Sequence, residues 1–264
     1  MSGAQEVPNN WLDELRLAYE SGAHGQFVLY GNVADRFPLD GRLVSLTRYM
    51  DAKLLGTFDI VFLYDPGNGL SLLRGGERFA QWPAAAQSQW PLDPREAVQL
   101  ISRYLRYRAN LQALGRGDSE HVAVILRGAE QVLPASRQGD FASASLASLV
   151  RDWAAEPPFA DMAFASLLLA DNLADLHPLV ANNPRIDRVQ VPLPDADSLG
   201  QCLAQLRIDH PAAFADEDNG AVQALAGVSL SALASLVKRR AHEGKVLGTQ
   251  DWIAAKKEMV ENDS

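Results

Sequence analysis

The chain is poor in cysteine and in long apolar runs. Its 264 residues include one cysteine, Cys202, which excludes an internal disulfide framework and a thiolate metal site. No apolar stretch reaches about 18 residues and no signal-peptide pattern is present, so neither membrane insertion nor export is predicted. The five histidines have no paired ligand spacing. We expect a cytoplasmic protein with no membrane partner and no metal site.

Positive charge is also scarce. Lysine and arginine number 24 against 33 aspartates and glutamates, a formal net charge of −9. A protein that binds nucleic acid neutralises phosphates with basic side chains, so nucleic acid is not an expected partner. The hydrophobic fraction of 47% is enough for a sizeable core.

Five apolar runs predict buried strands, and helix-forming sequence separates each from the next. The runs cover residues 26–31, 58–64, 121–126, 163–170 and 185–191, and residues 70–73 can add a short strand. Such alternation predicts parallel strands joined by crossover helices. After Pro194 only helical patterns follow, near residues 196–206, 218–225, 229–243 and 249–260. We therefore predict an α/β domain over residues 1–194 and a small all-helical domain over 195–264.

The first predicted strand runs into a glycine turn, Gly31-Asn32. In an α/β protein such a turn delivers a ligand-binding loop. A phosphate-binding P-loop needs GxxxxGK[ST], and the residues after Gly31 contain no Gly-Lys-Ser/Thr. From Asp40 the apolar spacing predicts a helix that closes at Gly56.

Two further segments can serve either packing or binding. Residues 75–94 are irregular and carry Trp82 and Trp90, which favours a covering loop or a binding loop. Residues 95–114 predict an amphipathic helix whose polar side includes Arg103, Arg106 and Arg108. Those arginines form either a solvated face or a partner-binding surface.

The order of elements and three motifs resemble the AAA+ branch of the P-loop NTPases. The motifs are FVLYGNVADRF, VAVILRGAEQVLP and SLLLADNLADLHP. The resemblance is specific to bacterial ATPases that carry an altered AAA+ module ahead of a complete one. It implies a five-stranded parallel sheet followed by a helical lid. It also implies that the chain is part of a longer protein whose second module begins at residues 256–264.

The resemblance identifies where charges are missing. It places the Walker A loop at Gly31–Pro38, where the phosphate-binding lysine and the Mg²⁺-binding hydroxyl have no counterpart. It places the two Walker B carboxylates after Ala123–Leu126, where Arg127 and Gly128 stand instead. Glu130 lies nearby but is displaced by two residues.

The resemblance also concerns three further positions. Two of them carry a matching polar or basic residue, and the third lacks the expected arginine. Asn172 matches a sensor residue at the tip of the fourth strand, or else caps the following helix. Arg185, with Arg188 as second choice, matches an arginine finger that acts on a neighbouring subunit, or else makes a surface salt bridge. The second-sensor arginine has no counterpart at Ser229–Ser231.

Three functions remain open at this point. The first is a catalytically degenerate AAA+ module with a structural role, whose partners are a second AAA+ module or neighbouring ring subunits and a protein substrate. The second is a module that binds ATP or ADP weakly without hydrolysis, with Arg36 replacing the missing cation. Its candidate residues are Gly31, Asn32, Val33, Asp35, Arg36 and Asn172. The third is a protein-interaction adaptor that uses no nucleotide.

Overall fold

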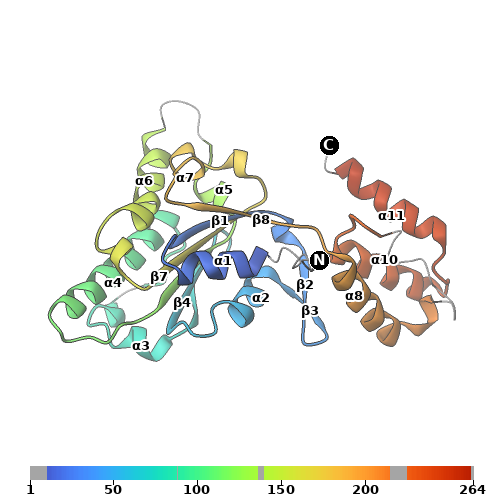
Figure 1. The fold of residues 1–264 in the computed structure, drawn as a ribbon, viewed down its shortest axis with the longest axis horizontal. Coiled ribbons are helices and arrows are strands. Elements are labelled where there is room, and N and C mark those ends of the chain that lie inside the picture. The colour runs from blue at the N-terminus through green and yellow to red at the C-terminus, as the bar shows by residue number, and fades with distance from the viewer. Residues whose placement is uncertain (1–10, 88, 136–139, 215–224, 263–264) are drawn as a thin grey trace, which may run out of the picture. The chain divides into compact units, whose positions relative to one another are not determined.

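The computed structural model describes residues 11–87, 89–135, 140–214 and 225–262, which divide into two compact units (Figure 1). The first unit contains the described residues up to Val33 together with Lys53–Val191. The second contains Ala34–Ala52 and the described residues from Pro192 onward. The sequence did not predict that residues 34–52 belong with the C-terminal helices. No helix among the described residues is long and apolar enough to cross a membrane.

The first unit is built on a six-stranded sheet. Its strand order is β5-β4-β6-β7-β1-β8. The strands are β1 (Gln26–Gly31), β4 (Ile60–Asp65), β5 (Gly69–Arg74), β6 (Val122–Leu126), β7 (Phe164–Ala170) and β8 (Asp187–Val191). All neighbours pair in parallel except β4 and β5. The predicted α/β fold with its parallel strands is confirmed, and the short strand expected at 70–73 is an antiparallel edge.

Helices cover both faces of this sheet, as its continuous apolar strands require. The long helices are α1 (Trp11–Glu20), α4 (Pro94–Ala113) and α6 (Phe141–Ala155). Helices α4 and α6 pack on the face that carries Val28, Phe62 and Val124. Leu15 of α1 lies beside Phe27 on the opposite face. Shorter helices are α3 (Gly76–Ala80), α5 (Ala129–Val132) and α7 (Pro178–Ala181).

The described part of the second unit combines a β-hairpin with helices α2, α8, α10 and α11. The elements are β2 (Arg36–Leu39), β3 (Arg42–Ser45), α2 (Leu46–Lys53), α8 (Ala196–Asp209), α10 (Leu230–Glu243) and α11 (Thr249–Asn262). Its core contains Leu199, Leu233 and Trp252, and Leu43 of the hairpin packs against it. Three of the four predicted helices are present, and the one predicted at 218–225 lies almost entirely outside the described residues.

The predicted helix from Asp40 is wrong in its first part, because residues 36–45 form the hairpin and the helix begins only at Leu46. Asp40 and Gly41 have φ of 49° and 73°. Two successive positive φ angles are those of a two-residue type I′ hairpin turn, for which Asp-Gly is a preferred sequence. This local turn chemistry outweighs the helical spacing of the apolar residues.

Two other segments differ in detail from the prediction. The helix expected after Asn172 is divided into a 3-10 turn, η4 (Leu173–Asp175), and α7. The irregular segment at 75–94 contains α3 and a second 3-10 turn, η2 (Ala85–Gln87). Within it Trp82 is buried, whereas 47% of the Trp90 surface is exposed.

Replacing Gly69 with alanine is expected to destabilise the first unit. Gly69 has a φ of 74°, and an added Cβ would lie 2.6 Å from the carbonyl oxygen of Pro91. Urea unfolding of Gly69→Ala should lose about 2–4 kcal/mol relative to the natural chain. The control Gly76→Ala, whose Cβ would meet no atom within 4 Å, should change stability by less than about 0.5 kcal/mol. Equal stability of the two variants would contradict this packing.

Candidate functional site

The carboxyl ends of β1 and β7 bring two of the predicted regions together. The backbone N–H of Gly31 donates to the carbonyl oxygen of Asp171 at 3.1 Å, so the turn after β1 lies beside the tip of β7. Asn172 follows directly, and its Oδ1 accepts a hydrogen bond from the Ala174 N–H at 3.0 Å. The alternative role predicted for Asn172, a helix cap, is therefore confirmed at η4.

An arginine occupies the place where the family resemblance expects a metal-binding carboxylate. Arg127 Nη1 lies 3.0 Å from Asp65 Oδ2, at the end of the neighbouring strand β4. The other oxygen of Asp65 accepts hydrogen bonds from the N–H groups of Gly67 and Asn68. The Asp65 carboxylate is thus engaged by a cation on one side and by a turn on the other.

Glu130 does not complete the missing acid pair. It lies in the first turn of α5, half-buried, and its Oε2 is buried without a hydrogen-bond partner. No cluster of three or more potential metal ligands exists among the residues that the structure describes. The Mg²⁺ and triphosphate implied by the fold family need a lysine, a hydroxyl and carboxylates. The residues at this edge do not fit them, because a paired arginine replaces the acid.

In the second unit, Asp35 holds the start of α10. Its Oδ2 accepts a hydrogen bond from the Leu230 N–H at 2.9 Å, and its Oδ1 accepts one from the Ser231 N–H at 2.8 Å. Ser229 Oγ accepts from the Ala232 N–H at 3.2 Å. These N–H groups have no acceptor inside the helix, and the helix dipole favours a negative charge there. We call this contact the Asp35 cap.

The Asp35 cap is buried inside the second unit. Asp35 is 5% exposed and Leu230 is fully buried. Cys202 of α8 lies near enough that burial, and secondarily the negative charge of Asp35, raises the pKa of its thiol to about 11. Cys202 is therefore a buried, protonated core residue at neutral pH.

The sequence pattern predicts a loop at Asp35 but does not indicate the helix N-terminus that its carboxylate binds. The family resemblance expects a cation at Ser229–Ser231, whereas a carboxylate from the segment after β1 lies there. One local signal was available, since Asp40-Gly41 between apolar residues marks a hairpin that begins next to Asp35. The contact itself joins residues 195 positions apart, which no local pattern encodes.

The other predicted site residues are distributed over both units. Asn32 and Val33 belong to the first unit, and Arg36 is an exposed residue at the start of β2 in the second. Arg185 Nη1 donates to the carbonyl oxygen of Ala155 at 2.7 Å, at the amino end of β8. Arg188, the second residue of β8, is exposed. Neither arginine lies at the carboxyl edge that carries Gly31.

The fold and the strand-end turns define an AAA+-related α/β protein. A family model described as "AAA+ chaperone, N-terminal Rossmann-like domain" matches residues 2–192. The chain therefore belongs to this family. No curated protein matches it. Among solved structures, a chain of the "E. coli MS115-1 HORMA:CdnC:Trip13 complex" is similar, with a TM-score of 0.51 and 14% identity. That match covers 96% of this chain and 79% of the other, and it supports the fold alone.

Asp35→Ala is expected to loosen the second unit, because it leaves two N–H groups without their carboxylate. Hydrogen bonds to a charged group contribute about 1.5–3 kcal/mol each, and we expect a net loss of about 2–4 kcal/mol. Cys202, the one cysteine, reports this loss without further engineering. Its labelling by a thiol reagent should accelerate roughly 30-fold for each 2 kcal/mol lost.

Asp197→Ala is the matched control for this experiment. Asp197 is an exposed carboxylate in the first turn of α8, another helix of the same unit. We expect its substitution to leave the labelling rate within about twofold of the natural chain. Unchanged labelling in Asp35→Ala would show that the Asp35 cap does not stabilise this unit.

Proposed function

We propose that this chain is a catalytically degenerate AAA+ module with a structural role in a larger ATP-driven assembly. The Asp35 cap is the observation that carries the proposal. In AAA+ proteins that hydrolyse ATP, the segment after the first strand binds the phosphates of the nucleotide. Here that segment is a hairpin, and its buried acidic residue is committed to the start of α10. Phosphates are anions, so a carboxylate in this segment disfavours them.

The pairing of Arg127 with Asp65 supports the same proposal. Hydrolysis needs Mg²⁺ and a base for the attacking water. The positive charge of Arg127 at the Walker B position opposes the binding of Mg²⁺. Glu130 is displaced by two residues and is poorly placed to act as the base. Removal of one stabilising group commonly lowers the rate about 10²–10³-fold, so several losses leave little activity.

The alternatives rank below this function. Weak binding of ATP or ADP would rest on Arg36, and no described contact favours it over solvent exposure. The expected partners are a second AAA+ module or neighbouring ring subunits, to which Arg185 or Arg188 would contribute in trans. A helical lid over residues 195–264 and a cytoplasmic location remain predictions. An adaptor role requires a surface on which a partner protein binds.

The proposal predicts that ATP neither reacts with nor stabilises the isolated chain. Phosphate release should equal that of an Asn172→Ala/Arg36→Ala variant, because any residual signal comes from contamination. At millimolar Mg²⁺·ATP the melting temperature should move by less than about 1 °C, since only a ligand that binds the folded state stabilises it.

A different outcome identifies a different function. Turnover that disappears in the double variant would overturn the degenerate-module proposal. A rise in melting temperature without turnover would favour the nucleotide-binding alternative instead.

A further inference from the structure

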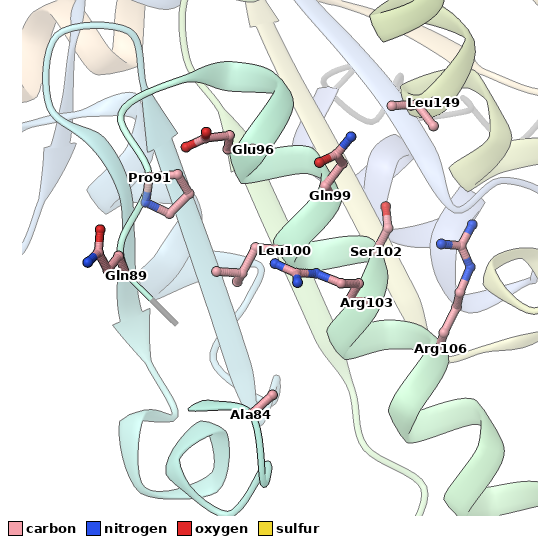
Figure 2. Close-up of a pocket in the computed structure, with 10 residues that line it drawn as sticks. All are labelled: Ala84, Gln89, Pro91, Glu96, Gln99, Leu100, Ser102, Arg103, Arg106 and Leu149. Atoms are coloured by element: carbon pink, nitrogen blue, oxygen red, sulfur yellow. The ribbon is translucent and has the colours of Figure 1, made fainter. Parts of the chain in front are cut away.

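A groove of about 700 Å³ lies on the first unit, along α4 (Figure 2). One wall is α4, the second is Leu149 of α6, and the third is formed by Ala84, Gln89 and Pro91. Its volume lies in the range of about 300–1,000 Å³ that is usual for ligand sites.

One line of polar side chains forms the α4 wall of this groove. The residues are Glu96, Gln99, Arg103 and Arg106. Their spacing of three, four and three residues places them on one face of a helix. Figure 2 shows this row, with Gln89 and Pro91 to one side and Leu149 to the other. From Glu96 to Arg106 the helix rises about 15 Å, the length of four or five extended residues at about 3.3 Å each.

The two arginines of the groove differ from the others on α4. Arg95 donates to Ser145 Oγ and the Ala142 carbonyl oxygen, and Arg108 Nε lies 3.0 Å from the buried carboxylate of Glu120. Among the described residues, no carboxylate lies within 4 Å of either Arg103 or Arg106. Two like charges one turn apart repel, and a bound anion would relieve that repulsion.

Arg106 is already held in position. Its guanidinium carbon lies 5.1 Å from the centre of the buried Phe159 ring, a cation–π contact that favours one orientation. The α4 wall beside it is also fixed, because Ser102 Oγ accepts a hydrogen bond from Trp153 Nε1 at 2.9 Å. A guanidinium held in this way binds a carboxylate with less loss of side-chain entropy.

The opposite wall is anchored to the sheet. The Leu70 N–H donates to the Pro91 carbonyl oxygen at 2.9 Å, and the Tyr64 hydroxyl donates to the Leu92 carbonyl oxygen at 2.7 Å. Between Gln89 and Pro91, Trp90 leaves 47% of its surface exposed. Its ring centre lies 5.3 Å from that of Phe79, so this part of the wall is also packed on α3.

We propose that this groove binds an extended acidic peptide segment of a partner protein. Two acidic side chains of the peptide pair with Arg103 and Arg106, and the amides of Gln89 and Gln99 bind its backbone. Glu96 at the far end of the row disfavours a nucleic acid, whose phosphates would continue along the whole groove. The chain as a whole is acidic, with a net charge of −9, so these two arginines are a local exception. This proposal does not depend on whether the chain binds nucleotide.

Fluorescence polarisation with labelled hexapeptide pools tests the proposal on the full chain. One pool carries a fixed Asp-Glu pair and the other a fixed Asn-Gln pair at the same positions. We expect the acidic pool to bind at least about tenfold more tightly, as charge-assisted hydrogen bonds exceed neutral ones. Arg103→Glu and Arg106→Glu should each weaken the acidic pool by about tenfold or more.

Arg116→Glu is the matched control, because Arg116 is exposed and lies outside the groove. It makes the same charge change and should leave binding within about twofold. Thermal unfolding of all three variants checks that the fold is retained. Equal binding of the two pools, or loss of binding in Arg116→Glu to the same extent, would overturn the proposal. Tighter binding of a labelled single-stranded hexanucleotide that needs Arg103 and Arg106 would also overturn it.

Discussion

Helix α10 begins with N–H groups that have no acceptor inside the helix. The carboxylate of Asp35 accepts hydrogen bonds from two of these N–H groups. The core of the second unit gathers around this helix, with Leu43 of the hairpin among its contacts. A protein that binds nucleotide with the segment after its first strand keeps that segment free for phosphate. Here an internal anion from that segment binds a helix N-terminus. This contact within the chain stabilises the start of α10.

At the carboxyl edge of the sheet, a positively charged side chain is likewise bound within the chain. Arg127 and Asp65 neutralise one another at 3.0 Å, and Asn172 caps a 3-10 turn. The side chains at this edge are therefore engaged with their own chain. Both observations support the proposed function, in which the module keeps the architecture of an AAA+ domain without acting on a nucleotide. The groove on α4 gives such a module a surface on which to receive a partner.

Much of the fold was predictable from local pattern, whereas the second unit was only partly so. Buried parallel strands such as Val122–Leu126 read as continuous apolar runs, which is why the sheet was predicted correctly. The hairpin after Asp35 was missed, because apolar spacing near Leu43 also fits a helix. The Asp35 cap was not predictable at all, since it joins residues 195 positions apart. The absence of Walker residues was visible in the sequence, but the contacts that replace them needed the structure.

Amide NMR of the chain during titration with Mg²⁺·ATP tests the central claim most directly. The decisive signals are the backbone amides of Gly31, Asn32, Leu230 and Ser231. If Asp35 already serves as the anion at the start of α10, these four amide shifts stay constant up to millimolar ATP. Saturable movement of these signals, with Asp35→Asn increasing the affinity, would mean that the segment after β1 still binds phosphate and would contradict the account.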